Sequence, residues 1–437
     1  FKQKTAYEIM PSLVGSEMCI RDSPYGKGTI PIDIPDSNLQ KVVLPKEIIQ
    51  PDRPEVIIRN ALFNPIGTDR LSQIATEYDK VAILVDDHTR PCPTKTLLPP
   101  VLEELQRANV RDSNIVIIIA NGTHKPPSDE MKREIVGDKV FRNYRVISND
   151  SINGEFYTVG KSKFGNEIEV LREYVEADIK IILGDIEYHY FAGYGGTRKS
   201  ILPGISSSRT VHNNHKMMFD ENAKAGVLKE NPIHQEMNEA MHLAGCDFAL
   251  NVVLNSRQRI VGAWAGNPDL VLDAGAKLVD EMYKINVDQK ADIVVTAASG
   301  HPHDLDLYQA YKALHTVLPV TKENGVIILV AECKNGHGND IYYEWMKKYK
   351  TAKEVEDKLK QSFVMGAHKA YYHLKAIEDH QIIFVSSMDK TEVEETFRFK
   401  HASDPNDALK QAFNIAGRDA SILVTPQGTT TLLELSQ

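Results

Sequence analysis

The 437-residue chain contains little cysteine, little tryptophan and no excess of positive charge. Its four cysteines, Cys19, Cys92, Cys246 and Cys333, lie far apart and form no Cys-x-x-Cys pair. This spacing argues against a disulfide framework or a cysteine-based zinc site and favours reduced thiols in the cytoplasm. The 51 basic and 60 acidic side chains leave a formal net charge of −9, so the basic surface that nucleic acid requires is missing.

Long apolar runs are also absent, since no stretch approaches the ~20 residues that cross a membrane. The N-terminus lacks the ordered regions of a signal peptide. We therefore expect a cytoplasmic protein that acts on small molecules, with neither nucleic acid nor membrane as a partner. Residues 1–23 show no periodicity, and "SLVGSEMCIRDS" resembles translated sequencing-adapter sequence. We expect residues 1–23 to be a non-native extension, with regular patterning from Pro24 onward.

Short apolar runs alternate with helical segments from Lys80 onward. The runs that read as buried strands are residues 80–87, 114–124, 177–185, 291–299, 325–333, 381–387 and 421–428. Buried strands that alternate with helices predict mostly parallel sheets covered on both faces. We expect an N-terminal α/β domain over residues 24–285 and a C-terminal α/β domain over residues 288–437. The pattern leaves open a return of the last residues to the first domain. An active-site cleft is expected between the two domains.

Polar clusters follow these predicted strands, where open parallel sheets bind their ligands. They are "DDHTRPCP" (86–93), "NGTHKPP" (121–127), "HYFAGYGGTRKS" (189–200), "VHNNHKMM" (211–218) and "DLYQAYKAL" (306–314). Each has an ordinary alternative: an Asp such as Asp87 is often a helix N-cap, and a lone His124 is more often structural. His212 and His215 have metal-ligand spacing, but such pairs are common by chance. The recurrence of polar clusters at strand ends favours a functional site.

The glycine-rich stretch before Lys199 invites a phosphate-loop interpretation. A P-loop has glycine directly before its lysine, but Arg198 occupies that place here. No G-x-G-x-x-G follows a strand either, so nicotinamide binding has little support. The nearby glycines can let backbone N–H groups approach an anion, and Lys199 needs another role.

Taken in this order, the motifs, together with "NPIHQEM" (231–237), resemble the lactate racemase family over about residues 24–430. The resemblance implies a racemase or epimerase that inverts C2 of a 2-hydroxy acid by reversible hydride transfer to a nickel-pincer nucleotide (nickel pyridinium-3,5-bisthiocarboxylic acid mononucleotide). It implies that Lys199 holds the cofactor covalently and that His215 is the nickel ligand. His124 and His189 match the two acid–base residues, one for each face of the substrate.

The resemblance also implies further contacts with the cofactor and the substrate. Arg90 would bind the substrate carboxylate and lie beside the cofactor. The other implied cofactor contacts are Asp87, Gly195, Gly196 and Tyr308, and the other implied substrate contacts are Gln309, Lys312 and His368. Where the family has a pocket tryptophan, residues 365–374 carry His368 and Lys369, which favours a larger or more polar substrate than lactate. Cofactor-building enzymes are the implied transient partners.

Two other functions stay open at this point. A metal-dependent hydrolase would use His212 and His215 as ligands of zinc or manganese, without a covalent cofactor. A non-catalytic protein would bind the nucleotide cofactor without racemising anything. The presence of both His124 and His189 argues against the second alternative.

Overall fold

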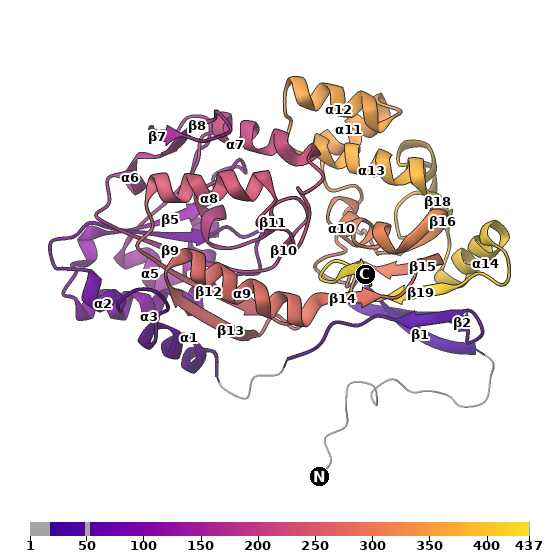
Figure 1. Cartoon of the computed structure of the whole chain (residues 1–437), viewed down its shortest axis with the longest axis horizontal. Helices are drawn as coiled ribbons and strands as arrows, with labels where there is room; N and C mark the ends of the chain where they lie inside the picture. The colour runs from indigo at the N-terminus through magenta and orange to yellow at the C-terminus, as the bar shows by residue number, and fades with distance from the viewer. Residues whose placement is uncertain (1–17, 49–52, 437) are drawn as a thin grey trace, which may run out of the picture. The chain divides into compact units, whose positions relative to one another are not determined.

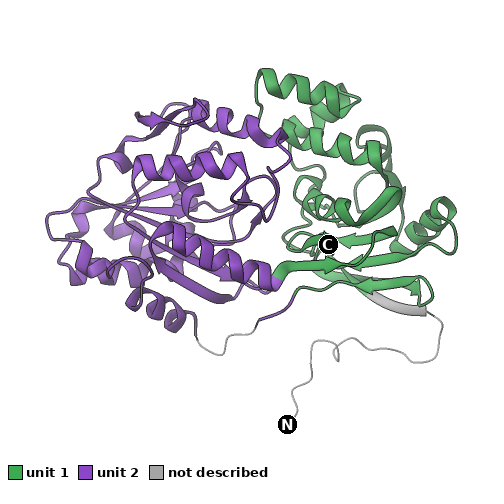
Figure 2. Ribbon diagram, viewed as in Figure 1, with its two compact units in different colours: residues 1–45, 283–437 green, residues 46–282 purple. Residues whose placement is uncertain are grey.

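The structure is a computed structural model that describes residues 18–48 and 53–436, and the chain forms two compact α/β units (Figures 1 and 2). Unit 1 comprises the described residues up to Pro45 and those from Tyr283 onward, and unit 2 comprises those from Lys46 to Met282. Each unit is built on a six-stranded sheet. The predicted fold class, α/β with mostly parallel sheets, is confirmed.

The sheet of unit 2 has the strand order β13-β12-β9-β4-β5-β6. Its strands are β4 (Val81–Asp86), β5 (Ile115–Ala120), β6 (Arg145–Ser148), β9 (Ile179–Asp185), β12 (Phe248–Leu254) and β13 (Ile260–Gly266). Every neighbouring pair is parallel except β12 and β13, which are antiparallel. The central strands are continuous apolar runs because both faces of the sheet are buried.

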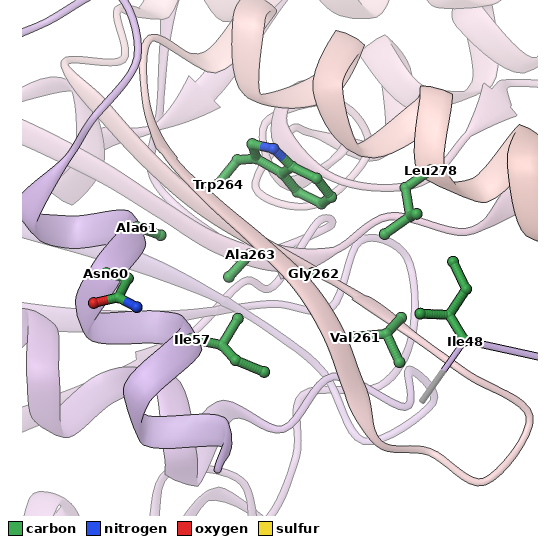
Figure 3. A pocket seen from close by; sticks show the side chains of 9 residues that line it. All are labelled: Ile48, Ile57, Asn60, Ala61, Val261, Gly262, Ala263, Trp264 and Leu278. Carbon is green, nitrogen blue, oxygen red and sulfur yellow. The ribbon is translucent and has the colours of Figure 1, made fainter. Parts of the chain in front are cut away.

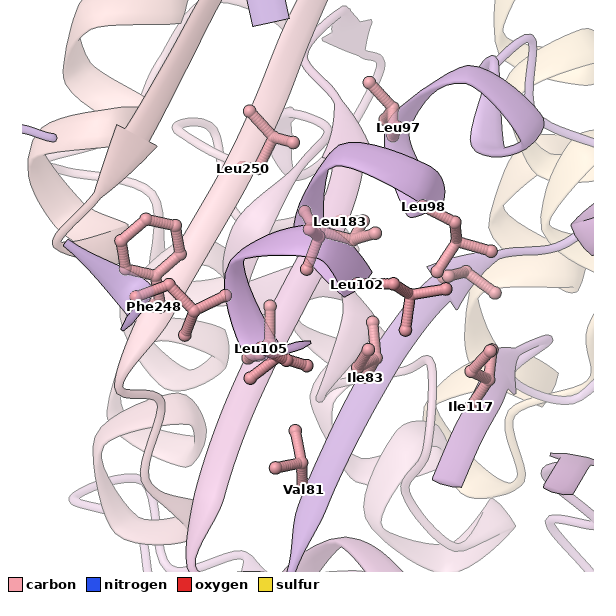
Figure 4. Close-up of a cluster of buried hydrophobic side chains, with 14 of the residues drawn as sticks. Val81, Ile83, Leu97, Leu98, Leu102, Leu105, Ile117, Leu183, Phe248 and Leu250 are labelled. Atoms are coloured by element: carbon pink, nitrogen blue, oxygen red, sulfur yellow. The ribbon is translucent and has the colours of Figure 1, made fainter. Parts of the chain in front are cut away.

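The helices of unit 2 are α1 (Pro54–Phe63), α2 (Leu71–Ile74), α3 (Thr94–Arg107), α4 (Asp129–Val136), α5 (Asp138–Asn143), α6 (Arg172–Val175), α7 (Ser208–His215), α8 (Pro232–Ala244) and α9 (Pro268–Tyr283). Unit 2 also contains two small antiparallel pairs of strands. One consists of β7 (Phe156–Lys161) and β8 (Glu167–Leu171), and the other of β10 (Tyr188–His189) and β11 (Gly193–Tyr194). Leucines of α3, such as Leu98 and Leu102, pack on Ile83 and Leu183 of the sheet (Figure 4). α3 therefore covers one face of the sheet, and the loops lie at the ends of its strands.

The sheet of unit 1 has the order β18-β17-β16-β15-β19-β3 and is parallel throughout. Its strands are β3 (Leu39–Val42), β15 (Ala291–Ala297), β16 (Thr321–Val330), β17 (Gln381–Val385), β18 (Lys400–Ala402) and β19 (Ile422–Thr425). The helices are α10 (Leu307–Val317), α11 (Asp340–Lys348), α12 (Ala352–Gln361), α13 (Ala367–Asp379) and α14 (Pro405–Ala416). No helix in the described part of the chain is both long and apolar enough to cross a bilayer.

The observed division of the chain differs from the expected boundaries of residues 24–285 and 288–437. Residues 24–45 belong to unit 1, because β3 pairs with β19 and because Ile32 and Ile34 are fully buried in the core of that unit. The chain end also stays in unit 1, where β20 (Leu432–Leu435) pairs in parallel with β14 (Lys284–Val287). Backbone pairing between distant segments carries no signature in the local pattern from which the boundaries were predicted.

The expected extension of residues 1–23 lies only partly within the described residues. β1 (Met18–Tyr25) pairs with β2 (Gly28–Pro35) as an antiparallel hairpin, so regular structure begins before Pro24. The hairpin turns at Gly26, whose φ of +55° suits glycine. A hairpin forms through backbone hydrogen bonds and does not require an alternation of apolar and polar residues in its sequence.

Candidate active site

The predicted site residues of unit 2 gather where β9, β4 and β5 end. These three strands are neighbours and run parallel, so their carboxyl ends share one edge of the sheet. β4 ends at Asp86 and leads to Asp87 and Arg90, whereas β9 ends at Asp185. His124 follows the end of β5. The sequence clusters therefore converge because the topology brings their strands together.

His124 and Asp87 form the first pair of this site. The Nδ1 atom of His124 lies 2.7 Å from Oδ2 of Asp87, and the Thr89 hydroxyl donates to the other oxygen at 2.6 Å. Burial opposes ionisation of Asp87, but the hydrogen bonds from His124 and Thr89 outweigh it and lower the pKa of Asp87. An ionised Asp87 accepts a hydrogen bond from Nδ1–H of His124, which leaves Nε2 of His124 to exchange protons with a substrate. The His124 side chain is about half exposed, as a substrate contact requires.

Arg90 lies among carboxylates. Its Nη1 atom donates to Oε1 of Glu187 at 2.8 Å, and Asp86 and Asp185 lie close enough to act on its charge. Burial raises the pKa of Asp86 to about 6 despite the opposing effect of Arg90. Burial and the neighbouring Glu187 raise the pKa of Asp185 well above its usual value. The guanidinium thus has a protein carboxylate as its partner here, and its contact with a substrate carboxylate stays a prediction.

Lys199 lies in the short 3-10 helix η3 (Thr197–Ser200) and is half-buried. Its ammonium group makes no hydrogen bond or ion pair with any residue that the structure describes. Burial lowers the pKa of Lys199 well below its usual value, and the positive charges of Arg90 and Arg198 lower it further. The neutral amine that this favours is the nucleophilic form of lysine. Lys199 is therefore suited to forming a covalent bond.

Arg198 has a structural role that the sequence did not reveal. The side chain is fully buried and donates to the carbonyl oxygens of Tyr194 and Gly195 at 2.8 Å. It also donates to the carbonyls of Ala192 and Gly196 and, through Nε, to Nδ1 of His234 at 2.9 Å. Burial lowers the pKa of Arg198 to about 9. Arg198 thus ties the glycine-rich loop together and fixes the backbone from which Lys199 extends.

The glycines before Lys199 are explained by the path of the loop itself. Gly196 has a φ of +81°, and a Cβ atom there would lie 2.6 Å from Oδ1 of Asn251. A Cβ atom at Gly193 would lie 2.1 Å from the carbonyl oxygen of Val227. Thr197 has a φ of +38°, rare for a β-branched residue, and its N–H donates to Asn251 at 2.9 Å. The predicted cofactor contacts of Gly195 and Gly196 stay predictions.

The rings of His215 and His189 both lie close to the ring of Phe191. The ring centroid of Phe191 is 4.5 Å from that of His189 and 5.0 Å from that of His215. His215 ends α7 and is buried, and burial together with the charge of Lys199 lowers the pKa of His215 to about 3. A neutral imidazole is the form that binds metal ions. The geometry therefore places a possible metal ligand near the reactive amine.

A second group of predicted residues lies in unit 1, on α10 and α13. Tyr308, Gln309 and Lys312 come from α10, and the ring of His368 on α13 lies 6.4 Å from that of Tyr308. Asp306 caps α10 by accepting from the Gln309 N–H at 2.8 Å. The predicted site residues thus form one group in each unit, and the expected cleft between the units stays a prediction.

The structure also gathers groups that the sequence reasoning missed. Ligand atoms of Asp86, Cys92 and Asp185 lie within 4.8 Å of one another. Within residues 18–48 and 53–436 this is the one such group of three, and it contains neither His212 nor His215. Asp86 and Asp185 could have been predicted as site residues because each lies at the end of a predicted strand. The ion pair of Glu187 with Arg90 has no signal in the sequence.

An open hollow of about 470 Å³ lies elsewhere in unit 2, beside β13 (Figure 3). Its lining is largely apolar and consists of Ile48, Ile57, Asn60, Ala61, Val261, Gly262, Ala263, Trp264 and Leu278. It contains no titratable side chain and so offers no acid, base or nucleophile. The candidate active site is therefore the polar group around Lys199.

The fold and the site define a two-unit α/β enzyme with candidate histidine acid–bases, an activated lysine and a neutral buried histidine. The family model for the lactate racemase N-terminal domain matches residues 25–226, and the model for the C-terminal domain matches residues 287–433. The chain therefore belongs to the lactate racemase family, a family of isomerases.

Individual relatives agree with this assignment. The lactate racemase of Thermoanaerobacterium thermosaccharolyticum is 34% identical over 94% of this chain and 98% of its own length. The lactate racemase of Lactiplantibacillus plantarum is 30% identical over 93% of this chain and 98% of its own length.

Solved structures agree as well. The lactate racemase apoprotein of T. thermosaccharolyticum is 33% identical and superposes with a TM-score of 0.89 over 95% of this chain and 100% of its own. A Thermotoga maritima protein that is 18% identical, with a TM-score of 0.67 over 90% of this chain and 100% of its own, shares the fold.

Proposed function

We propose that this chain is a racemase or epimerase that inverts C2 of a 2-hydroxy acid, using a nickel-pincer nucleotide tethered to Lys199. One observation carries the proposal: a half-buried lysine amine of depressed pKa, without an ion pair among the described residues, lies near the neutral, buried His215. Its partners would be a small-molecule substrate and, transiently, the enzymes that build the cofactor.

The residues present fit such a cofactor. Lys199 would hold it through a thioamide bond, because its amine is favoured in the neutral, nucleophilic form. His215 would bind the nickel through a neutral imidazole nitrogen. When bound, the group supplies a reversible hydride acceptor. The anchored loop of Arg198 keeps the Lys199 backbone in place for this attachment.

Proton transfer falls to His124 and His189. Inversion of a stereocentre requires a base for each orientation of the substrate, and each histidine can take up the hydroxyl proton in one direction and return it in the other. Asp87 orients His124 through the bond to Nδ1. Arg90 would bind the substrate carboxylate bidentately, at the expense of its contact with Glu187. Tyr308, Gln309, Lys312 and His368 would provide further contacts.

The test is to produce the protein together with the cofactor-building enzymes. Metal analysis and intact mass should then show nickel and an adduct on Lys199. A panel of chiral 2-hydroxy acids should lose optical purity when incubated with this protein. Absence of nickel, of the adduct and of racemisation together would rule the proposal out.

A further inference from the structure

The segment "NPIHQEM" (231–237) opens α8, and none of its residues takes part in the chemistry proposed above. Three of its polar side chains are nevertheless covered: Asn231 and Glu236 are at most 1% exposed, and His234 is half-buried. Polar groups are buried where hydrogen bonds within the protein replace those to water. The partners of these three side chains therefore show which parts of unit 2 the segment holds.

Asn231 joins the start of α8 to the segment that follows His189. Its Oδ1 atom accepts from the N–H of Ile233 at 3.0 Å, and its Nδ2 atom donates to the carbonyl oxygen of Phe191 at 2.9 Å. The N–H of the same peptide group, that of Ala192, donates to Nδ1 of His189 at 3.2 Å. The placement of the His189 ring thus depends on a peptide group that Asn231 holds.

His234 joins α8 to the residue before Lys199. Its Nδ1 atom accepts from Nε of Arg198 at 2.9 Å. Burial and the charge of Arg198 lower the pKa of His234 to about 3, so the ring is neutral and Nδ1 can accept this bond. The other nitrogens of Arg198 donate to backbone carbonyls within residues 192–196. His234 therefore connects α8 to the turn from which Lys199 extends.

Glu236 joins α8 to the end of α7. Its carboxyl group accepts from the Ser162 hydroxyl at 2.6 Å and from the side-chain amides of Asn166 at 3.2 Å and Asn214 at 3.0 Å. Asn214 is fully buried and directly precedes His215, the last residue of α7. Glu236 therefore fixes the turn of α7 that carries His215.

We propose that Asn231, His234 and Glu236 are positioning residues that hold the reactive side chains of unit 2 at fixed distances from one another. In the same order, the residues that they position are His189, Lys199 and His215. One helix is the common support, because residues 231–237 span about two turns at the start of α8. A displacement of about 1 Å in a reacting group can lower a rate by about 100-fold. The inference rests on the proposed function, which gives the positioned residues their roles.

The test measures three properties of the cofactor-loaded protein, namely nickel content, the adduct on Lys199, and kcat. Asn231→Ser keeps an acceptor for the helix cap but loses the donor to Phe191. It should lower kcat by about 10- to 100-fold at unchanged KM, with nickel and adduct retained. Glu236→Gln should lower the affinity for nickel by about 10- to 100-fold and leave the adduct in place.

His234→Leu should slow the formation of the adduct by about tenfold, because Lys199 then extends from a turn that has lost its link to α8. Nickel content and kcat should follow the amount of adduct. His234→Gln keeps an acceptor for Nε of Arg198 and should recover most of the loss. No recovery in His234→Gln would contradict the role of this acceptor.

A second measurement uses the cofactor-free protein and reports on the imidazole rings directly. Diethyl pyrocarbonate modifies accessible imidazole nitrogens, and peptide mass spectrometry gives the rate of modification at each histidine. Asn231→Ser should speed the modification of the buried His189 by about tenfold, because its ring is held less firmly. Glu236→Gln should do the same for the buried His215. In each variant the other ring should change by less than about twofold.

Glu239→Gln is the matched control, because it makes the same change as Glu236→Gln further along α8. Glu239 accepts from the backbone N–H of Lys163 at 3.1 Å in an exposed hydrogen bond. Glu239→Gln should leave nickel content, adduct, kcat and both rates of modification unchanged.

The outcomes separate positioning from folding and from the proposed function. Equal loss of all properties in every variant, in step with a loss of stability, would show that the segment only supports the fold and would overturn the inference. Unchanged properties in all variants would overturn it as well. If the unaltered protein acquires neither nickel nor adduct, the proposed function fails, and the modification rates of His189 and His215 still decide the positioning. If Glu236→Gln does not fold, Asn214→Ala removes the same hydrogen bond from the other side and takes its place.

Discussion

The two units share a scaffold but carry different kinds of side chains. Both have a six-stranded, mostly parallel sheet. In unit 2, the acids and His124 lie at or just beyond the ends of strands, Lys199 lies in a 3-10 turn, and His215 ends α7. In unit 1, the tyrosines and lysines project from α10 and α13. The loop before Lys199 is held by hydrogen bonds from the Arg198 side chain to backbone carbonyls. We therefore expect changes in unit 2 to affect the chemical step and changes in unit 1 to affect substrate binding.

The largest effect should follow from Lys199→Met. The variant should carry no covalent adduct and show no racemisation, yet it should fold, because the change removes a buried amine. Intact mass and circular dichroism test both points. Lys277→Met on the exposed side of α9 is the control and should retain adduct and activity. Detection of a covalent adduct on the Lys199→Met variant would show that Lys199 is not the residue that holds the cofactor.

His124→Ala and His189→Ala should each lower kcat by about 10²- to 10⁴-fold, the usual contribution of an acid–base residue. The adduct should remain, since neither histidine is expected to hold the cofactor. Initial rates of racemisation from each enantiomer measure the loss. His242→Ala, which removes an exposed histidine beside Asp269, should leave the rates unchanged. Full activity in either site variant would contradict the two-base assignment.

Arg198→Met should lower the free energy of unfolding by about 3 kcal/mol or more, because several buried carbonyl groups lose their donor. Chemical denaturation measures the change. Arg209→Met removes an exposed arginine that pairs with Glu167 and Glu169, and it should cost less than about 1 kcal/mol. Equal effects of the two substitutions would show that the loop does not depend on Arg198.

Asp86→Asn should alter the pH dependence of stability. Burial raises the pKa of Asp86 from 3.8 to about 6, so the folded protein holds a proton that the unfolded chain releases between these values. Ionisation of Asp86 therefore lowers the free energy of unfolding as the pH rises through this window. Relative to the unaltered protein, Asp86→Asn should gain stability on the order of 1 kcal/mol between pH 4 and pH 7. Denaturation curves of both proteins at pH 4 and pH 7 measure this gain. A difference in the free energy of unfolding between the two proteins that is the same at both pH values would contradict the prediction.

The smallest effect is expected in unit 1, from Gln309→Ala. The loss of one neutral hydrogen bond to the substrate should raise KM by about two- to tenfold. The adduct and kcat should stay unchanged, in contrast to substitutions in unit 2. Steady-state kinetics with separate values of kcat and KM distinguish the two cases. A fall in kcat without a change in KM would show that Gln309 contributes to the chemical step and not to substrate binding.

Most strands could be predicted from the sequence, because their apolar runs are local. The run at 80–87 became β4 (Val81–Asp86), and the run at 177–185 became β9 (Ile179–Asp185). Residues 24–45 were assigned to the other domain, because only the pairing of β3 with β19 shows where they belong. The motifs also predicted the family, whereas the roles of the individual site residues stay predictions.

By itself, the sequence determined the class of fold, the family and the residue types available for chemistry. These depend on local patterns and on motifs in a fixed order, which a linear chain displays directly. Only the tertiary structure decided the partner of Arg90, the burial of Lys369 and the use of Arg198 as the anchor of its own loop. Burial and charge proximity set these properties, and both arise from contacts between segments far apart in the chain.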